Sequence, residues 1–200
     1  MISQWSRLSE ALTQRMQIAD GLAPLLIRLY LAPVMMQAGW TKFQSFESTV
    51  QWFGNAEWGL GLPFPEVMVT LAAGTELIGG ALLIPGIAVR WVSIPLLFTM
   101  LIAMLTVHWE NGWLAIADSS SWLANERVME AGERLERVRS ILREHGNYDW
   151  LTGRGSVVVL NNGIEFAATY AIMLLSLVFT GGGRFTSVDD WLKRRFTTGH

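Results

Sequence analysis

One carboxylate, Glu76, lies in the middle of an apolar stretch that runs from Glu66 to Ile84. The stretch is apolar over about 18 residues, which is long enough for a helix to cross a bilayer. Glycine disfavours helices in water, whereas small residues let helices pack closely in lipid. Because a charge at membrane depth is costly, we expect Glu76 to face the interior of a helix bundle and to have a partner. The small residues around Glu76 are Ala72, Ala73, Gly74, Thr75, Gly79 and Gly80.

The composition supports a membrane protein. Hydrophobic residues make up 51% of the 200-residue chain and charged residues only 16%, whereas charged residues are about a quarter of a typical soluble domain. A net charge of -2 argues against a nucleic-acid-binding protein, which would carry a basic surface. The chain has no cysteine, which excludes disulfides, thiolate zinc sites and cysteine nucleophiles.

Four apolar segments predict a single membrane domain over residues 1–200, an all-α four-helix transmembrane bundle. The first and third segments contain Pro33 and Pro95, which are tolerated in a membrane because neighbouring helices satisfy the freed carbonyls. The predicted spans are about 22–38, 66–84, 87–107 and 157–180.

Amphipathic segments flank the predicted spans. Residues 1–20 fit either an interfacial helix or a frayed polar tail, and they do not resemble a signal peptide. Residues 43–53 predict a short interfacial helix. A longer amphipathic helix is expected at about 119–146, stabilised by pairs such as Glu130 with Arg134 and ending at Gly146. Either lipid or another protein can cover its apolar face.

The distribution of basic residues predicts the orientation. Positive residues gather on the cytoplasmic side of membrane proteins. The N-terminal segment, the turn near Arg90 and the C-terminal tail are basic, whereas the first loop contains only Lys42. Both termini are therefore expected in the cytoplasm.

Several motifs resemble those of a known family. The runs LIRLYLAPVMMQAGWTKF, WFGNAEWGLGLPFP and TELIGGALLIPGIAVRWVSIPLLFTMLIAMLTVHWENGW look like the DoxX family of four-helix membrane proteins. The later SILREHGNYDWLTGRGSVVVLNNGIEFAATY and GGGRF look like its HvfX-type branch. The resemblance implies a bacterial inner-membrane protein associated with maturation of copper-binding ribosomal peptides (bufferins). The family name also implies quinone-linked redox work for some members.

Buried charges supply the first candidate site. Helix rise places Arg28 and Glu76 at similar depths, roughly 10 and 12 Å from the cytoplasmic edge, so we predict that they pair. The residues leave two interpretations open. The pair either fixes helix register or serves as a proton relay or quinone site.

Polar residues near the outer edge supply a second candidate. Lys42, His108 and Glu165, with Asn161 and Asn162 one turn away from Glu165, are expected to form a polar cavity open to the periplasm. In the simpler alternative each side chain caps its own helix or meets lipid headgroups.

A third candidate is a metal site. Met100, Met104 and His108 are spaced by four, so they share one helical face. Thioether and imidazole groups suit Cu(I), although methionine is also a common filler of irregular cores.

The sequence leaves the function open among three classes. The first is a membrane protein of copper-peptide maturation, with quinone as a candidate cofactor and an oxidoreductase activity. The second is a carrier or exporter of the peptide or of copper. The third is a scaffold that holds soluble maturation enzymes at the membrane. No hydrolase elbow, phosphate-binding loop or HExxH motif is present.

Overall fold

The computed structural model describes residues 20–197, which confirm the all-α prediction. Apart from an isolated bridge between Ile116 and Leu160, the regular structure of these residues is helical. The amphipathic helix predicted at the N-terminus falls on residues 1–19, outside the described residues. Among the described residues, three helical segments are long and apolar enough to cross a membrane: Leu22–Gln44, Pro65–Leu83 and Val89–Asn111.

The chain divides into two compact units. The first comprises residues 1–99 and 170–200, and the second comprises residues 100–169. The first unit contains α2 (Leu22–Gln44), α3 (Phe46–Gly54), α4 (Pro65–Leu83), most of α5 (Val89–Ala103), the later part of α8 (Glu165–Thr180) and α9 (Val188–Thr197).

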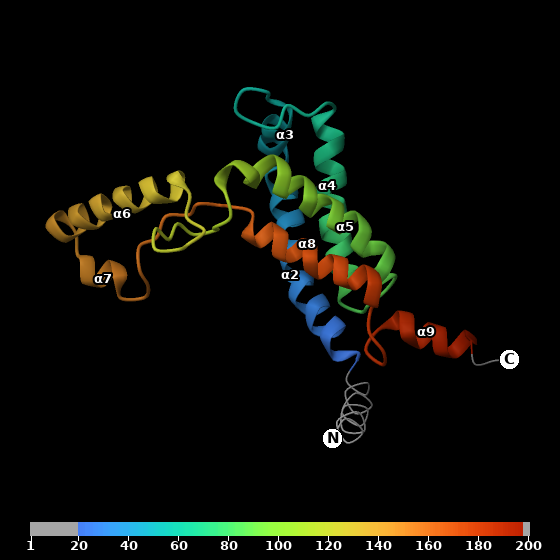
Figure 1. Ribbon diagram of the computed structural model, residues 1–200. Helices are drawn as coiled ribbons and strands as arrows, with labels where there is room; N and C mark the ends of the chain where they lie inside the picture. The colour runs from blue at the N-terminus through green and yellow to red at the C-terminus, as the bar shows by residue number, and fades with distance from the viewer. Residues whose placement is uncertain (1–19, 198–200) are drawn as a thin grey trace, which may run out of the picture. The chain divides into compact units, whose positions relative to one another are not determined.

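Helices α2 and α4 run antiparallel and form the closest packing in the first unit (Figure 1). A Cβ added to Gly39 would lie 2.7 Å from the Ala73 carbonyl oxygen, and one added to Gly80 would lie 2.9 Å from the Ala32 carbonyl oxygen. The backbones therefore touch at two levels seven residues apart. These two contacts fix the register, since a slip would bring a larger side chain against the opposite backbone.

The ends of α4 follow from local sequence. Pro65 occupies the first helical position, where its missing N–H costs nothing. The helix ends at Leu83, and the turn that follows contains Gly86 with φ of 73°, a conformation that glycine adopts without strain. Helix α4 thus coincides with the predicted second span, 66–84, to within one residue at each end. The first span is longer than predicted, since α2 continues through Pro33 to Gln44.

Two further helices pack in the first unit. Leu96 of α5 fills the space above Gly79, where an added Cβ would lie 3.1 Å from the leucine side chain. Tyr170 of α8 packs on Tyr30 of α2, with ring centroids 6.3 Å apart. The fully buried core residues of this unit come from all four helices: Leu31, Ala32, Val69, Leu83, Val89, Leu96, Leu174 and Leu177.

The second unit contains the long polar segment. The third span departs from α-helix at Met104–His108, which forms a π-helical turn, and closes with a 3₁₀ turn at Trp109–Asn111. Helix α6 covers Glu126–His145 and α7 covers Tyr148–Thr152. The predicted helix at 119–146 therefore begins about two turns late, because Asn125 caps it by accepting a hydrogen bond from the Val128 N–H.

The fourth span does not start where the sequence suggests. Residues 157–164 are not helical, and α8 begins at Glu165. Their backbone instead pairs with residues 112–117: the Asn161 N–H donates to the Ala115 carbonyl and the Gly163 N–H donates to the Leu114 carbonyl. Helix α8 is apolar but has only 16 residues, so it is shorter than the predicted span.

A glycine-to-alanine series tests the register of α2 on α4. Gly39→Ala and Gly80→Ala should each destabilise the fold by about 1–3 kcal/mol through overpacking. This corresponds to a fall in melting temperature of roughly 2–10 °C in neutral detergent. Gly74→Ala is the matched control, because nothing lies within 4 Å of a Cβ added there. A similar loss in all three variants would contradict the close contact.

Candidate functional site

A buried ion pair joins α2 to α4 in the first unit. Lys42 Nζ donates to Glu76 Oε2 over 2.7 Å. The Glu76 side chain is 3% exposed and that of Lys42 is 27% exposed, so the carboxylate is enclosed while the ammonium can still be approached. Glu76 thus has a partner, as its position requires, but the predicted Arg28–Glu76 pair is wrong.

The register of the two helices explains why Lys42 reaches Glu76. Side chains in a helix lean toward its N-terminus, so on antiparallel helices those of Lys42 and Glu76 lean toward one another. They converge beside Gly39, where the helices are in backbone contact and an added Cβ would lie 3.1 Å from the Glu76 Cβ. The long stem of the lysine spans the remaining gap.

The same register places Arg28 at the far end of α4. Its guanidinium is fully buried. Nη1 donates to the carbonyl oxygens of Leu83 and Ile84 over 3.0 and 3.2 Å, and Nη2 donates to that of Thr186 over 2.7 Å. Arg28 therefore satisfies carbonyls that the end of a helix leaves unpaired, and it links α2 to the segment before α9.

A second charged residue, Asp189 on the C-terminal segment, completes this link. The Asp189 carboxylate accepts hydrogen bonds from the backbone N–H groups of Ala88 and Val89, over 2.7 and 2.8 Å. It caps the start of α5 from a position 100 residues later in the chain, where the helix dipole favours a negative charge. Arg28 and Asp189 interact electrostatically. Together they hold the turn between α4 and α5 against the start of α9.

The residues predicted for an outer cavity lie in different units. Lys42 belongs to the first unit and is bound to Glu76. In the second unit, Glu165 Oε2 accepts from the Ala115 N–H over 3.0 Å, and Asn161 donates to the carbonyls of Asn111 and Leu114. Glu165 and Asn161 thus tie the start of α8 and the segment before it to residues 111–115. A cavity that joins Lys42 to His108 and Glu165 stays a prediction.

The proposed metal ligands lie where the third span changes its helical form. Met100 lies in the last turn of α5, and Met104 and His108 bound the π-helical turn. Short π segments often occur at functional sites. His108 Nδ1 is 2.8 Å from the Asn162 carbonyl oxygen, a contact that orients the ring and leaves Nε2 for another partner. The Cu(I) site itself stays a prediction. Among the described residues, no cluster of three His, Cys, Asp or Glu side chains suits a metal ion.

The sequence did contain a signal for the correct partner of Glu76. Ala32 and Gly39 on α2 are seven residues apart, as are Ala73 and Gly80 on α4. Matching these pairs in antiparallel order gives the observed register and brings Lys42 to Glu76. Estimating depth from the helix ends misplaced Arg28, because α2 and α4 do not end at the same level.

Substitution of Arg28 tests its role in holding the C-terminal segment. Arg28→Met keeps an apolar stem but removes three hydrogen bonds, which should favour opening of the segment by about 1.5–3 kcal/mol. Trypsin should then cleave after Arg184 or Lys193 at least about tenfold faster than in the wild type. Arg154→Met, at an exposed loop position, is the control and should leave the rate unchanged. An unchanged rate in Arg28→Met would show that other contacts hold the segment.

Comparison with known proteins finds a similarity that covers these residues. Residues 23–109 match the DoxX family. The chain is also similar to the "Putative oxidoreductase CatD" of Bacillus subtilis (strain 168), with 36% identity over 94 residues, which are 47% of this chain and 66% of the relative. The chain thus spans just under two thirds of that relative's length. No solved structure matches. Arg28, Lys42 and Glu76 all lie within residues 23–109, the part of the chain that matches the DoxX family, and the apolar helices of this part suggest a membrane protein.

Proposed function

We propose that this DoxX-type protein is a membrane component of a quinone-linked oxidoreductase, with Lys42 and Glu76 as the quinone site. The observation that carries the proposal is the asymmetry of the pair: a buried carboxylate is bound to a lysine that remains 27% exposed. Ionisable groups at membrane depth are functional candidates by default. The similarity to a protein named as an oxidoreductase supports redox work.

The chemistry of the pair suits a quinone. A quinone enters from the lipid and presents two carbonyl oxygens, and the Lys42 ammonium donates a hydrogen bond to one of them. Reduction of the quinone to the quinol consumes two electrons and two protons. In this proposal an electron-donating partner protein supplies the two electrons. Lys42 passes one proton to the carbonyl oxygen that it binds and is reprotonated through Glu76, and the second carbonyl oxygen takes its proton from water.

The membrane arrangement is part of the same proposal. We place the protein in the bacterial inner (cytoplasmic) membrane as a four-helix bundle, with α8 as the fourth span and both termini in the cytoplasm. The basic C-terminal segment supports this orientation. Helix α8 is about 24 Å long at 1.5 Å per residue, so the fourth span crosses where the bilayer is locally thinned.

The pathway is proposed from the sequence motifs beyond residue 109. Their likeness to the HvfX-type branch supports participation in the maturation of a copper-binding ribosomal peptide. The bound partners would then be that peptide and its maturation enzymes. The alternatives are a carrier or exporter of the peptide or copper and a membrane scaffold for soluble enzymes.

Substitutions at the ion pair test the quinone site. Lys42→Met should destabilise the protein by about 3–5 kcal/mol, because it leaves the buried Glu76 carboxylate unpaired. Glu76→Leu should destabilise it less, because the Lys42 ammonium that it leaves unpaired is 27% exposed. The Lys42→Met/Glu76→Leu double variant should recover stability. It should nevertheless bind a short-chain ubiquinone at least about tenfold more weakly than the wild type, since the hydrogen bond from a charged donor is lost. Binding can be followed in detergent by tryptophan fluorescence quenching.

Glu66→Gln is the matched control, since Glu66 is an exposed carboxylate in the first turn of α4 and should not affect quinone binding. If the stable double variant binds ubiquinone as the wild type does, the pair only fixes helix register.

Mass spectrometry of the peptide from a strain that lacks this protein separates the pathway alternatives. The redox proposal predicts that the peptide leaves the cytoplasm but lacks a modification. If the protein is a carrier, its loss should instead leave mature peptide in the cytoplasm. If it is a scaffold, its loss should leave the maturation enzymes unable to co-sediment with membranes. Fully modified, correctly located peptide would contradict all three.

A further inference from the structure

A hollow of about 570 Å³ lies in the first unit where α5 begins, α8 ends and α9 starts. It is lined by the glycine-rich loop Gly181–Gly182–Gly183, by Arg90 and Trp91 of α5 and by the start of α9. The loop is tightly built. A Cβ on Gly182 would lie 2.6 Å from the Ser187 Cβ, and Gly181 and Gly183 have φ of 75° and 91°. The hollow is therefore a fixed feature of the fold.

Two carboxylates line the hollow, but both are already compensated. Asp189 binds the first N–H groups of α5 and interacts with Arg28. Asp190 accepts from the Phe185 N–H over 2.8 Å and from Arg194 Nε over 2.7 Å. The Phe185 hydrogen bond, together with the Arg194 and Arg184 guanidiniums, lowers the pKa of Asp190 below its ordinary value. Asp190 is therefore ionised at neutral pH and is paired with Arg194.

Three further cations line the hollow, and one of them, Arg184, lies near enough to Asp190 to help lower its pKa. Arg90, Arg184 and Lys193 are exposed, and none of them forms an ion pair with any described residue. Arg90 lies over the loop, with its Nε 3.1 Å from the position of a Cβ on Gly181. Three positive charges around one hollow repel one another in the absence of a ligand and favour an anion.

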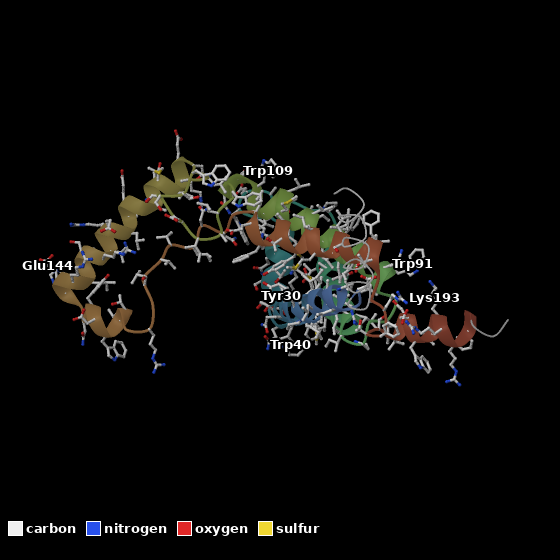
Figure 2. All side chains as sticks on the ribbon, turned by 60° about the horizontal axis from the view of Figure 1, so that its bottom comes forward. Tyr30, Trp40, Trp91, Trp109, Glu144 and Lys193 are labelled. Carbon is white, nitrogen blue, oxygen red and sulfur yellow. The ribbon has the colours of Figure 1, made fainter. Side chains whose placement is uncertain are left out.

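The surroundings place this cationic hollow at a membrane surface. It lies at the ends of two apolar helices, α5 and α8, where a spanning helix meets the headgroups. Trp91, on the rim, is 77% exposed, and exposed tryptophan is typical of that level. Figure 2 labels Trp91 and Lys193, which both line the hollow. Helix α9 also exposes Trp191 and Phe196 beside Arg194 and Arg195, as helices lying on a membrane do.

We propose that this hollow binds a phosphate-bearing anion, with Arg90, Arg184 and Lys193 as its ligands. Arginine guanidiniums match phosphate oxygens in a bidentate manner, and lysine adds a point charge. The shared chemistry is a phosphate monoester or diester, either the headgroup of an anionic phospholipid or a free phosphate compound. Basic pockets between spanning helices bind anionic lipid headgroups elsewhere.

The test compares two triple variants of the full chain in neutral detergent. Arg90→Gln/Arg184→Gln/Lys193→Gln removes the three ligands. Arg137→Gln/Arg154→Gln/Arg195→Gln removes the same charge from exposed positions that do not line the hollow. The probes are short-chain phosphatidylglycerol, phosphatidylcholine of the same chain length, glycerol phosphate and inorganic phosphate. Binding is measured by native mass spectrometry and by the rise in melting temperature.

Phosphatidylglycerol should bind the wild type and the control variant at least about tenfold more tightly than the ligand variant. If glycerol phosphate binds as tightly, the ligand is a free phosphate compound and the site stands. The proposal is overturned if no phosphate probe binds the wild type, if phosphatidylcholine binds as well as phosphatidylglycerol, or if the control variant loses as much affinity as the ligand variant. Because all six positions are exposed, both variants should fold, and their melting temperatures without probe verify this.

Discussion

The backbone contact between α2 and α4 determines most of the first unit. At Gly39 and Gly80 the two helices approach more closely than any side chain would allow. Dispersion contacts of this kind are a main source of helix association in lipid, where burial of apolar surface gives no advantage. The resulting register brings Lys42 to Glu76 and Arg28 to the carbonyls that end α4. Each buried charge then has a partner, without which it would be too costly to keep.

The charges of the first unit serve two different purposes. Arg28 and Asp189 bind mainly backbone groups at helix ends. They therefore stabilise the turn between α4 and α5 and hold the C-terminal segment against this turn. Lys42 and Glu76 bind one another, and neither side chain is needed to satisfy a helix end. That difference makes the second pair the better candidate for chemistry, because its groups can exchange partners without unfolding a helix terminus.

The second unit shows how polar residues near a membrane can be structural. Glu165 and Asn161 lie close in sequence to an apolar helix, which suggests a ligand site. In the structure they bind backbone groups of residues 111–115. These hydrogen bonds help residues 157–164 to adopt a non-helical backbone in which their polar groups still have partners. Hydropathy alone could not reveal this, since Val157, Val158 and Val159 are as apolar as the helix that follows.

The sequence by itself determined the all-α class, the bounds of the second span and the helix end at Gly146, because these depend on local hydropathy, proline and glycine. It also marked Glu76 as a group that needs a partner. Only the tertiary structure decided which partner. The choice between Arg28 and Lys42 depends on a register set by backbone contacts between two helices, and similar depth from a helix end does not define that register. The same holds for Asp189, whose role at the start of α5 requires residues 100 positions apart to meet.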